Sequence, residues 1–139
     1  MGNFDTANAF TDALNAQQWD TLASLLTDDF TFSGATPQPA DRQGFIAAQQ
    51  QWAAGVPDWH VTQENVQEEG STVRATSRIS GTQTNTLTLP MMPPIPATGK
   101  SFSATMAATL TVRGDKVASL GVVPGTPGIF EQLGVQPPA

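Results

Sequence analysis

Residues 101–112, Ser-Phe-Ser-Ala-Thr-Met-Ala-Ala-Thr-Leu-Thr-Val, alternate between apolar and small or polar side chains. Successive residues of a β-strand point to opposite faces of a sheet, so a period of two predicts a strand with one buried face. The buried set is Phe102, Ala104, Met106, Ala108, Leu110 and Val112. The opposite set has no charged side chain, whereas a sheet face in water usually carries some. The stretch therefore predicts a core strand with an uncharged outer face.

The segments around this strand show either the same alternation, typical of strands, or the three- and four-residue spacing of apolar residues that is typical of helices. Four further strands are predicted at residues 59–66, 72–80, 82–89 and 116–123, separated by breaks rich in glycine and proline. Before them, apolar spacings of three and four residues predict two helices within residues 3–26, with a break at 15–18, and a short strand at 30–32. A third helix is expected from its N-cap Asp41 to Gly55. Helices followed by hairpin-connected strands predict an α+β domain with an antiparallel sheet.

Length and composition narrow the function classes. A chain of 139 residues predicts one domain over 1–139, with 135–139 expected to be a frayed tail. The net charge of −6 disfavours nucleic acids and anionic membrane surfaces as partners. We see no long apolar run and no secretory signal, so a cytoplasmic location without membrane insertion is expected. One histidine and no cysteine argue against a metal site, and we expect no cofactor.

His60 is the side chain best suited to proton transfer near neutral pH. Asp58 lies two residues earlier, and on a strand it would point to the same face and orient the imidazole. The pair is therefore our candidate catalytic site. The alternative is a surface histidine at the start of a strand, with Asp58 capping a turn.

Short motifs in the second half of the chain carry a family resemblance. They are Pro57-Asp58, Gly-Thr-Gln-Thr at 81–84, Pro-Ala-Thr-Gly-Lys at 96–100, Gly-Asp-Lys-Val at 114–117 and Gln-Leu-Gly at 132–134. In this order the sequence resembles the SnoaL-like polyketide (ester) cyclase family. The resemblance implies a cone-shaped nuclear transport factor 2-like fold, in which a curved antiparallel sheet packs on N-terminal helices around an apolar pocket. It also implies a dimer, and an acid–base aldol chemistry that closes rings.

The sequence departs from that family where protons would be transferred. The family's cyclases carry an aspartate on the last strand, but residues 118–126 contain no Asp, Glu or His. Gln83 replaces the histidine of the Gly-Thr-His-Thr-Gly motif, and Asn85 replaces its last glycine.

Three functions remain open: an acid–base enzyme that uses His60 with Asp58, a non-catalytic module that binds a small apolar carbonyl or polyketide-like molecule, and a dimerisation unit. The expected pocket residues are Trp52, Gln83, Asn85, Met91, Met92, Phe102, Ala104 and Met106.

The uncharged outer face predicts a homodimer. Two rows of small or β-branched side chains would form the interface: Thr82, Thr84, Thr86 and Thr88 on one strand, and Ser103, Thr105, Ala107, Thr109 and Thr111 on another. Such rows leave a flat surface on which a second sheet can pack.

Overall fold

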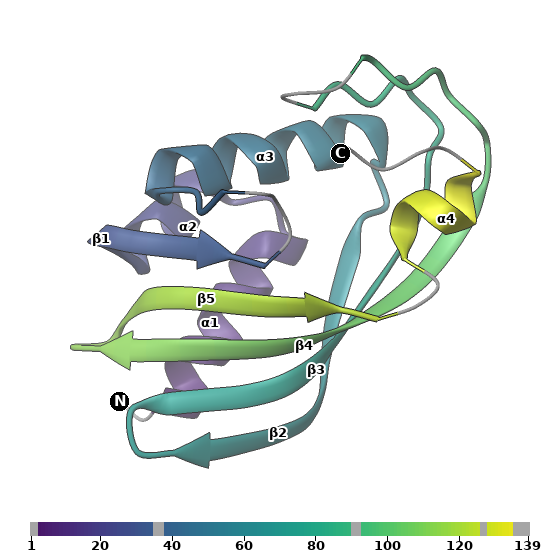
Figure 1. Cartoon of the computed structure of the whole chain (residues 1–139). Helices are drawn as coiled ribbons and strands as arrows, with labels where there is room; N and C mark the ends of the chain where they lie inside the picture. The colour runs from purple at the N-terminus through teal and green to yellow at the C-terminus, as the bar shows by residue number, and fades with distance from the viewer. Residues whose placement is uncertain (1–2, 35–37, 90–92, 126–127, 135–139) are drawn as a thin grey trace.

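The computed structural model describes residues 3–34, 38–89, 93–125 and 128–134, and within these ranges five strands form one sheet in the order β1-β5-β4-β3-β2 (Figure 1). The strands are β1 (Leu26–Ser33), β2 (His60–Glu69), β3 (Thr72–Thr82), β4 (Ser101–Arg113) and β5 (Lys116–Pro124). The helices are α1 (Asn3–Asn15), α2 (Trp19–Ser24), α3 (Arg42–Gly55) and α4 (Ile129–Leu133). The predicted α+β class, the helices before the sheet and the long strand at 101–112 are confirmed.

The sheet is mixed. Strands β2 to β5 pair antiparallel in chain order, but β1 runs parallel to β5, with Phe32 opposite Leu120. The expectation of a wholly antiparallel sheet was wrong at this edge. A hairpin turn forces its two strands to be antiparallel. In the chain, α3 and three strands separate β1 from its neighbour β5, so no short turn fixes the direction of β1 relative to β5.

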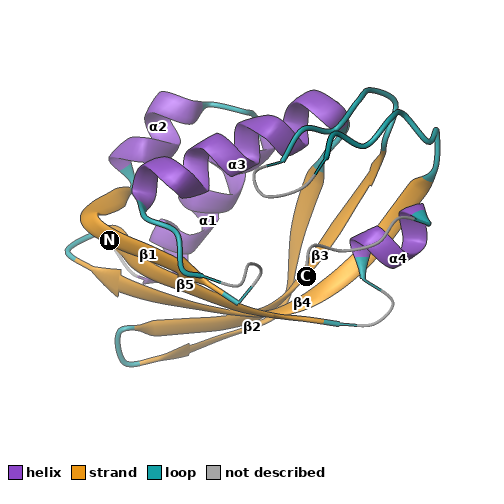
Figure 2. Ribbon diagram, turned by 45° about the horizontal axis from the view of Figure 1, so that its top comes forward, coloured by secondary structure: helices purple, strands orange, loops and turns teal. Residues whose placement is uncertain are grey.

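The sheet curves around α1, α2 and α3, which lie on its concave face (Figure 2). One cause of the curvature is an irregularity in β2 between Glu64 and Gln67, where the register with β3 shifts and Asn65 adopts a φ of 53°. An extra residue of this kind bends the strand and increases its twist.

Two apolar clusters fill the concave side. The larger joins α1, α3 and β1 to the sheet around Phe10, Phe30 and Phe45, whose rings pack against one another. The smaller contains Trp59, Phe102 and Leu133 and lies toward α4. Met106 on β4 packs against both clusters, so the cavity described below lies where they meet.

Local signals set the helix boundaries as predicted. The carboxylate of Asp41 accepts a hydrogen bond from the backbone N–H of Gly44 at 2.8 Å, as an N-cap does. The chain leaves α1 through Gln17, which adopts a φ of 55°, before α2 begins at Trp19. The helix prediction at the N-terminus and at 41–55 is therefore confirmed.

The strand predicted at 82–89 is wrong. β3 ends at Thr82, and residues 83–89 form an irregular arm in which Leu87 pairs with Ile95 as an isolated bridge. The reason lies in the hydrogen-bond partners. Asn85 donates from its backbone to the carbonyl of Gly55 at 3.2 Å and from its side chain to that of Ala54 at 3.0 Å, so it binds the end of α3 instead of a neighbouring strand.

None of the described helices is both long enough and apolar enough to cross a membrane.

Candidate functional site

A cavity of about 590 Å³ lies between α3, the concave face of the sheet and α4. Its walls include Phe45 and Trp52 from α3, Leu120 and Val122 from β5, and Ile129 from α4. Pockets that enclose small organic ligands span roughly 300–1,000 Å³, so the cavity is large enough for a molecule of two or three fused rings.

Aromatic rings form the end of the cavity nearest α4. The ring centroids of Trp52 and Trp59 are 5.1 Å apart, and those of Trp52 and Phe130 are 5.7 Å apart. Phe102 packs behind Trp59 at 6.1 Å. Flat rings at these separations stabilise one another and offer a rigid apolar surface to a ligand.

Polar side chains are few on this lining. Among the described lining residues they are Gln49, Gln63, Ser77, Thr105 and Glu131. Within that described set Glu131 is the one ionisable residue, and it is exposed at the first turn of α4. Its carboxylate accepts a hydrogen bond from the backbone N–H of Gly128 at 3.1 Å. No lysine, arginine or histidine belongs to the described lining, so the cavity offers no cation to an anionic ligand.

The predicted pocket residues divide into three groups: those that line the cavity, those that do not, and those outside the described residues. Trp52, Ala104 and Met106 line the cavity. Phe102 is buried in the aromatic cluster behind Trp59 and does not belong to the described lining. Met91 and Met92 lie outside the described residues.

Gln83 is buried where residues 83–89 pack against residues 93–100, instead of facing the cavity. Its side-chain N–H groups donate to the carbonyls of Ile95 at 3.1 Å and Pro96 at 3.2 Å, and its amide oxygen accepts from the hydroxyl of Thr98 at 2.8 Å. Asn85 is exposed and bonded to the end of α3. Both amides therefore hold the arm in place, and the structure does not bring either into the described lining.

His60 and Asp58 lie apart from the cavity. Val61 and Gln63 of β2 line it, so the alternation of the strand turns His60 to the convex face, where it is exposed opposite Ser80. The carboxylate of Asp58 accepts from the backbone N–H of Thr82 at 2.8 Å. The catalytic role of this pair stays a prediction, and the geometry gives Asp58 a bond that fastens the end of β3.

Sequence reasoning missed Gln63, Ser77 and Glu131 as pocket residues. Gln63 and Ser77 face each other on β2 and β3, and both are polar residues on an apolar face. A correct inner and outer assignment for 59–66 would have found Gln63, because it shares a face with Val61. No local pattern points to Glu131, because it lies on the short helix α4, whose place beside the cavity depends on tertiary packing.

The convex face of the sheet differs from the one expected. Thr84, Thr86 and Thr88 do not extend a strand beside β4; instead β3 pairs with β4, placing Arg78 opposite Thr105 and Arg74 opposite Thr109. Both arginines are exposed and form ion pairs, with Glu64 at 3.3 Å and Glu69 at 3.8 Å. The face is therefore partly charged, and the homodimer stays a prediction.

The chain is similar in structure to several solved proteins. IdmH, a candidate polyketide cyclase from Streptomyces antibioticus, is 24% identical, with 97% of this chain and 100% of that chain covered at a TM-score of 0.77. A candidate SnoaL-like polyketide cyclase from Jannaschia sp. CCS1 is 19% identical, with 97% and 93% covered at 0.79. AclR, a candidate hydroxylase from Streptomyces galilaeus, is 13% identical, with 97% of each chain covered at 0.79. At these sequence identities the similarity establishes the fold alone, because proteins with different activities can share one fold.

No curated protein matches the chain. The family model of the SnoaL-like domain matches residues 7–120. That range runs from α1 to the middle of β5 and includes most of the elements that enclose the cavity. The chain therefore belongs to the SnoaL-like domain family, and its fold is the nuclear transport factor 2-like fold that the sequence motifs predicted.

Proposed function

We propose that the protein binds one small, uncharged and largely apolar molecule in the cavity of about 590 Å³. The observation that carries this proposal is the composition of the described lining, which is mostly apolar and contains a single ionisable side chain, Glu131. An uncharged ligand loses little on leaving water, whereas an anionic ligand would lose its hydration with no cation in that lining to replace it. Similarity to candidate polyketide cyclases supports a ligand of polycyclic size.

A matched pair of fluorescent probes tests the proposal. N-phenyl-naphthylamine is uncharged, and its sulfonated counterpart, anilinonaphthalene sulfonate, has the same rings with one negative charge. We expect the uncharged probe to bind with increased emission and the sulfonate to bind at least about tenfold more weakly, which corresponds to about 1.4 kcal/mol. In a Trp19→Phe variant, energy transfer from Trp52 and Trp59 reports binding beside these rings. Equal affinity for both probes, or no binding, contradicts the proposal.

Proton transfer on the bound molecule is a second candidate function, favoured by the Glu131 carboxylate on the described lining. β5 runs through Val117, Leu120 and Val122 without an acidic or imidazole side chain, so the last-strand aspartate of the family's cyclases has no counterpart there. If the protein closes a diketone by aldol condensation, a Glu131→Gln variant should lose the turnover and keep the affinity. A His60→Ala variant should keep both, because His60 faces the opposite side of the sheet.

Turnover that disappears in a folded His60→Ala variant would instead support the catalytic pair predicted from the sequence. Absence of turnover in every variant, together with probe binding, leaves the protein as a binding module. The two functions are thus separated by one set of measurements.

A further inference from the structure

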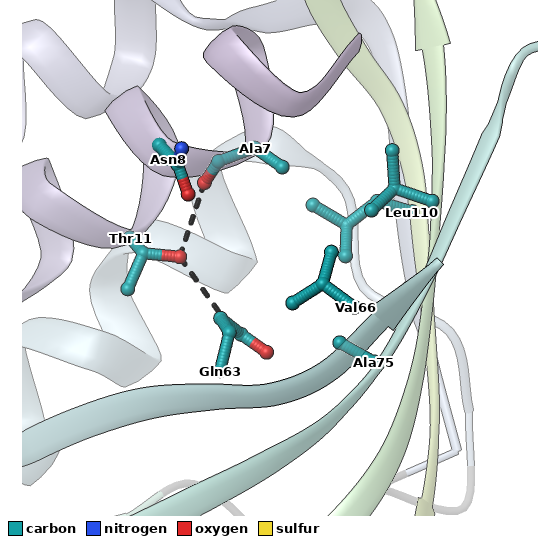
Figure 3. A pocket seen from close by; sticks show the side chains of 8 residues that line it. Ala7, Asn8, Thr11, Gln63, Val66, Ala75 and Leu110 are labelled. Carbon is teal, nitrogen blue, oxygen red and sulfur yellow. Dashed lines mark hydrogen bonds between the residues drawn. The ribbon is translucent and has the colours of Figure 1, made fainter. Parts of the chain in front are cut away.

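A line of hydrogen bonds joins three polar side chains, from Thr11 on α1 to Gln63 and Ser77 on the sheet side of the cavity. The hydroxyl of Ser77 donates to the amide oxygen of Gln63 at 2.8 Å, and the amide nitrogen of Gln63 donates to the hydroxyl oxygen of Thr11 at 3.4 Å. Thr11 in turn donates to the backbone carbonyl of Ala7 at 3.0 Å. Figure 3 shows Gln63, Thr11 and Ala7 in this order, with dashed lines along the two bonds that join them.

Gln63 lies between two cavities. It lines the large one and also a space of about 10 Å³ behind it, enclosed by residues of α1, β2, β3 and β4 (Figure 3). A space of that size holds about one water molecule. Ser77 is 7% exposed and lines only the large cavity of the two. The Gln63 amide and the Ser77 hydroxyl therefore form a polar site on the part of the cavity wall made by β2 and β3, where the neighbouring lining residues are apolar.

The helix fixes the direction of every hydrogen bond in the line. The carbonyl of Ala7 can only accept, so the single hydroxyl proton of Thr11 is committed to it. Thr11 can then only accept from Gln63, which places the amide nitrogen on that side and the amide oxygen toward Ser77. If the amide were reversed, its oxygen would face Thr11. The Thr11 hydroxyl would then have to donate to that oxygen across 3.4 Å and would give up its 3.0 Å bond to the carbonyl of Ala7.

These hydrogen-bond directions leave one donor on Gln63 and one acceptor on Ser77 for a ligand. An amide nitrogen has two protons, and Gln63 uses one on Thr11. Ser77 uses its proton on Gln63, so its oxygen keeps lone pairs that accept. Within the part of the chain that the structure describes, no residue accepts from the second N–H of Gln63 and none donates to the Ser77 oxygen. Polar groups in an apolar site favour a ligand that completes their hydrogen bonds.

We propose that Gln63 and Ser77 are the recognition pair of the cavity, in which Gln63 donates to a carbonyl oxygen of the ligand and Ser77 accepts from a neighbouring hydroxyl. Thr11 is a positioning residue that sets the direction of the Gln63 amide. The ligand class is an uncharged, ring-containing hydroxy ketone. The inference rests on the proposed binding function and adds to it the polar group that the pocket selects.

Three ligands with one carbon skeleton test the pair: an alkyl naphthalene, the naphthyl ketone with a carbonyl on the same chain, and the β-hydroxy derivative of that ketone. Titration calorimetry should show the ketone binding about fivefold more tightly than the hydrocarbon, and the hydroxy ketone about fivefold more tightly again, since each added hydrogen bond contributes a net amount of this order. If none binds, the proposed function and this inference are both overturned. If all three bind with equal affinity, the binding function stands and the inference is overturned.

Variants assign each preference to a residue. Gln63→Met should abolish the advantage of the ketone over the hydrocarbon, and Ser77→Ala should abolish only the added advantage of the hydroxyl. Thr11→Val should reduce both preferences while hydrocarbon affinity stays constant, because the amide is then free to reverse. Thr62→Val is the control, since Thr62 is exposed on the convex face and should change nothing.

Hydrocarbon affinity serves as the measure of an intact pocket in every variant. If Gln63→Met fails to fold, Ser77→Ala still decides the hydroxyl preference. A folded Ser77→Ala variant that keeps the full preference for the hydroxy ketone overturns the pair.

Discussion

The side-chain amide of Gln132 pairs with the backbone of Ser103. Its oxygen accepts from the N–H of Ser103 at 2.9 Å, and its nitrogen donates to the carbonyl of Ser103 at 3.0 Å. β5 pairs with β4 only from Met106 onward, so among the described residues no strand lies beside Ser103 on that side. Gln132 therefore takes the place of a strand neighbour and fixes α4, which lines the cavity, to the sheet. This is a structural role for the Gln-Leu-Gly motif.

Gln132→Ala should loosen α4 from β4. We expect a loss of roughly 1–3 kcal/mol in the free energy of unfolding, because two backbone groups lose their partner. Urea denaturation measures the loss, and amide hydrogen exchange at Ser103 should become faster. Gln50→Ala, on the exposed side of α3, is the control and should change the stability by less than about 0.5 kcal/mol. An unchanged exchange rate at Ser103 would show that Gln132 does not hold this edge.

Ala48→Trp should fill the cavity. Ala48 lies on α3 and lines the cavity, so an indole at this position occupies ligand volume. We expect the affinity for the uncharged probe to fall by more than about tenfold, equivalent to 1.4 kcal/mol, while the circular dichroism spectrum is retained. Ala47→Trp is the matched control, because Ala47 is the adjacent residue and is exposed. Equal probe affinity in the two variants would place the binding site elsewhere.

Val123→Glu tests the predicted homodimer. Val123 is 68% exposed and lies opposite Ala107 on the convex face of β5 and β4. Light scattering on wild-type protein should give about twice the chain mass of 14.6 kDa. The variant should approach the monomer, because burying an unpaired carboxylate costs several kcal/mol. A wild-type mass near 14.6 kDa refutes the dimer, and a dimer that tolerates Val123→Glu uses another surface.

The pair of Asp29 and Arg113 predicts a pH effect. The hydrogen bond from the Arg113 guanidinium lowers the pKa of Asp29 below its ordinary value of 3.8. A carboxyl whose folded-state pKa is lowered stabilises the fold above its unfolded pKa, and this contribution is lost as the pH falls through the folded pKa. Nuclear magnetic resonance titration of the Asp29 carboxyl should show the low midpoint. Arg113→Gln should return it toward 3.8. An unchanged midpoint would show that the arginine is not its cause.

Patterns carried by neighbouring residues could be predicted from the sequence. The alternation in 101–112 predicts β4, and the N-cap Asp41 predicts the start of α3, because each signal depends on residues a few positions apart. The family motifs predicted the fold, although several of their polar residues prove to be structural. Asp58 bonds to Thr82, and Gln83 bonds to Thr98, so these residues fasten the arm and the end of β3.

Tertiary structure alone decided which polar residues reach the cavity. The threonine alternation of 82–89 looks like a strand, but the amides of Gln83 and Asn85 find partners on the arm and on α3, far along the chain. His60 and Gln63 lie on one strand, yet the side of β2 that faces α1 is set by packing, and it turns Gln63 inward and His60 outward. Glu131 and Ser77 reach the same cavity from elements that are remote in the sequence. A local pattern gives the period of a strand, but only long-range packing determines which of its two faces is buried.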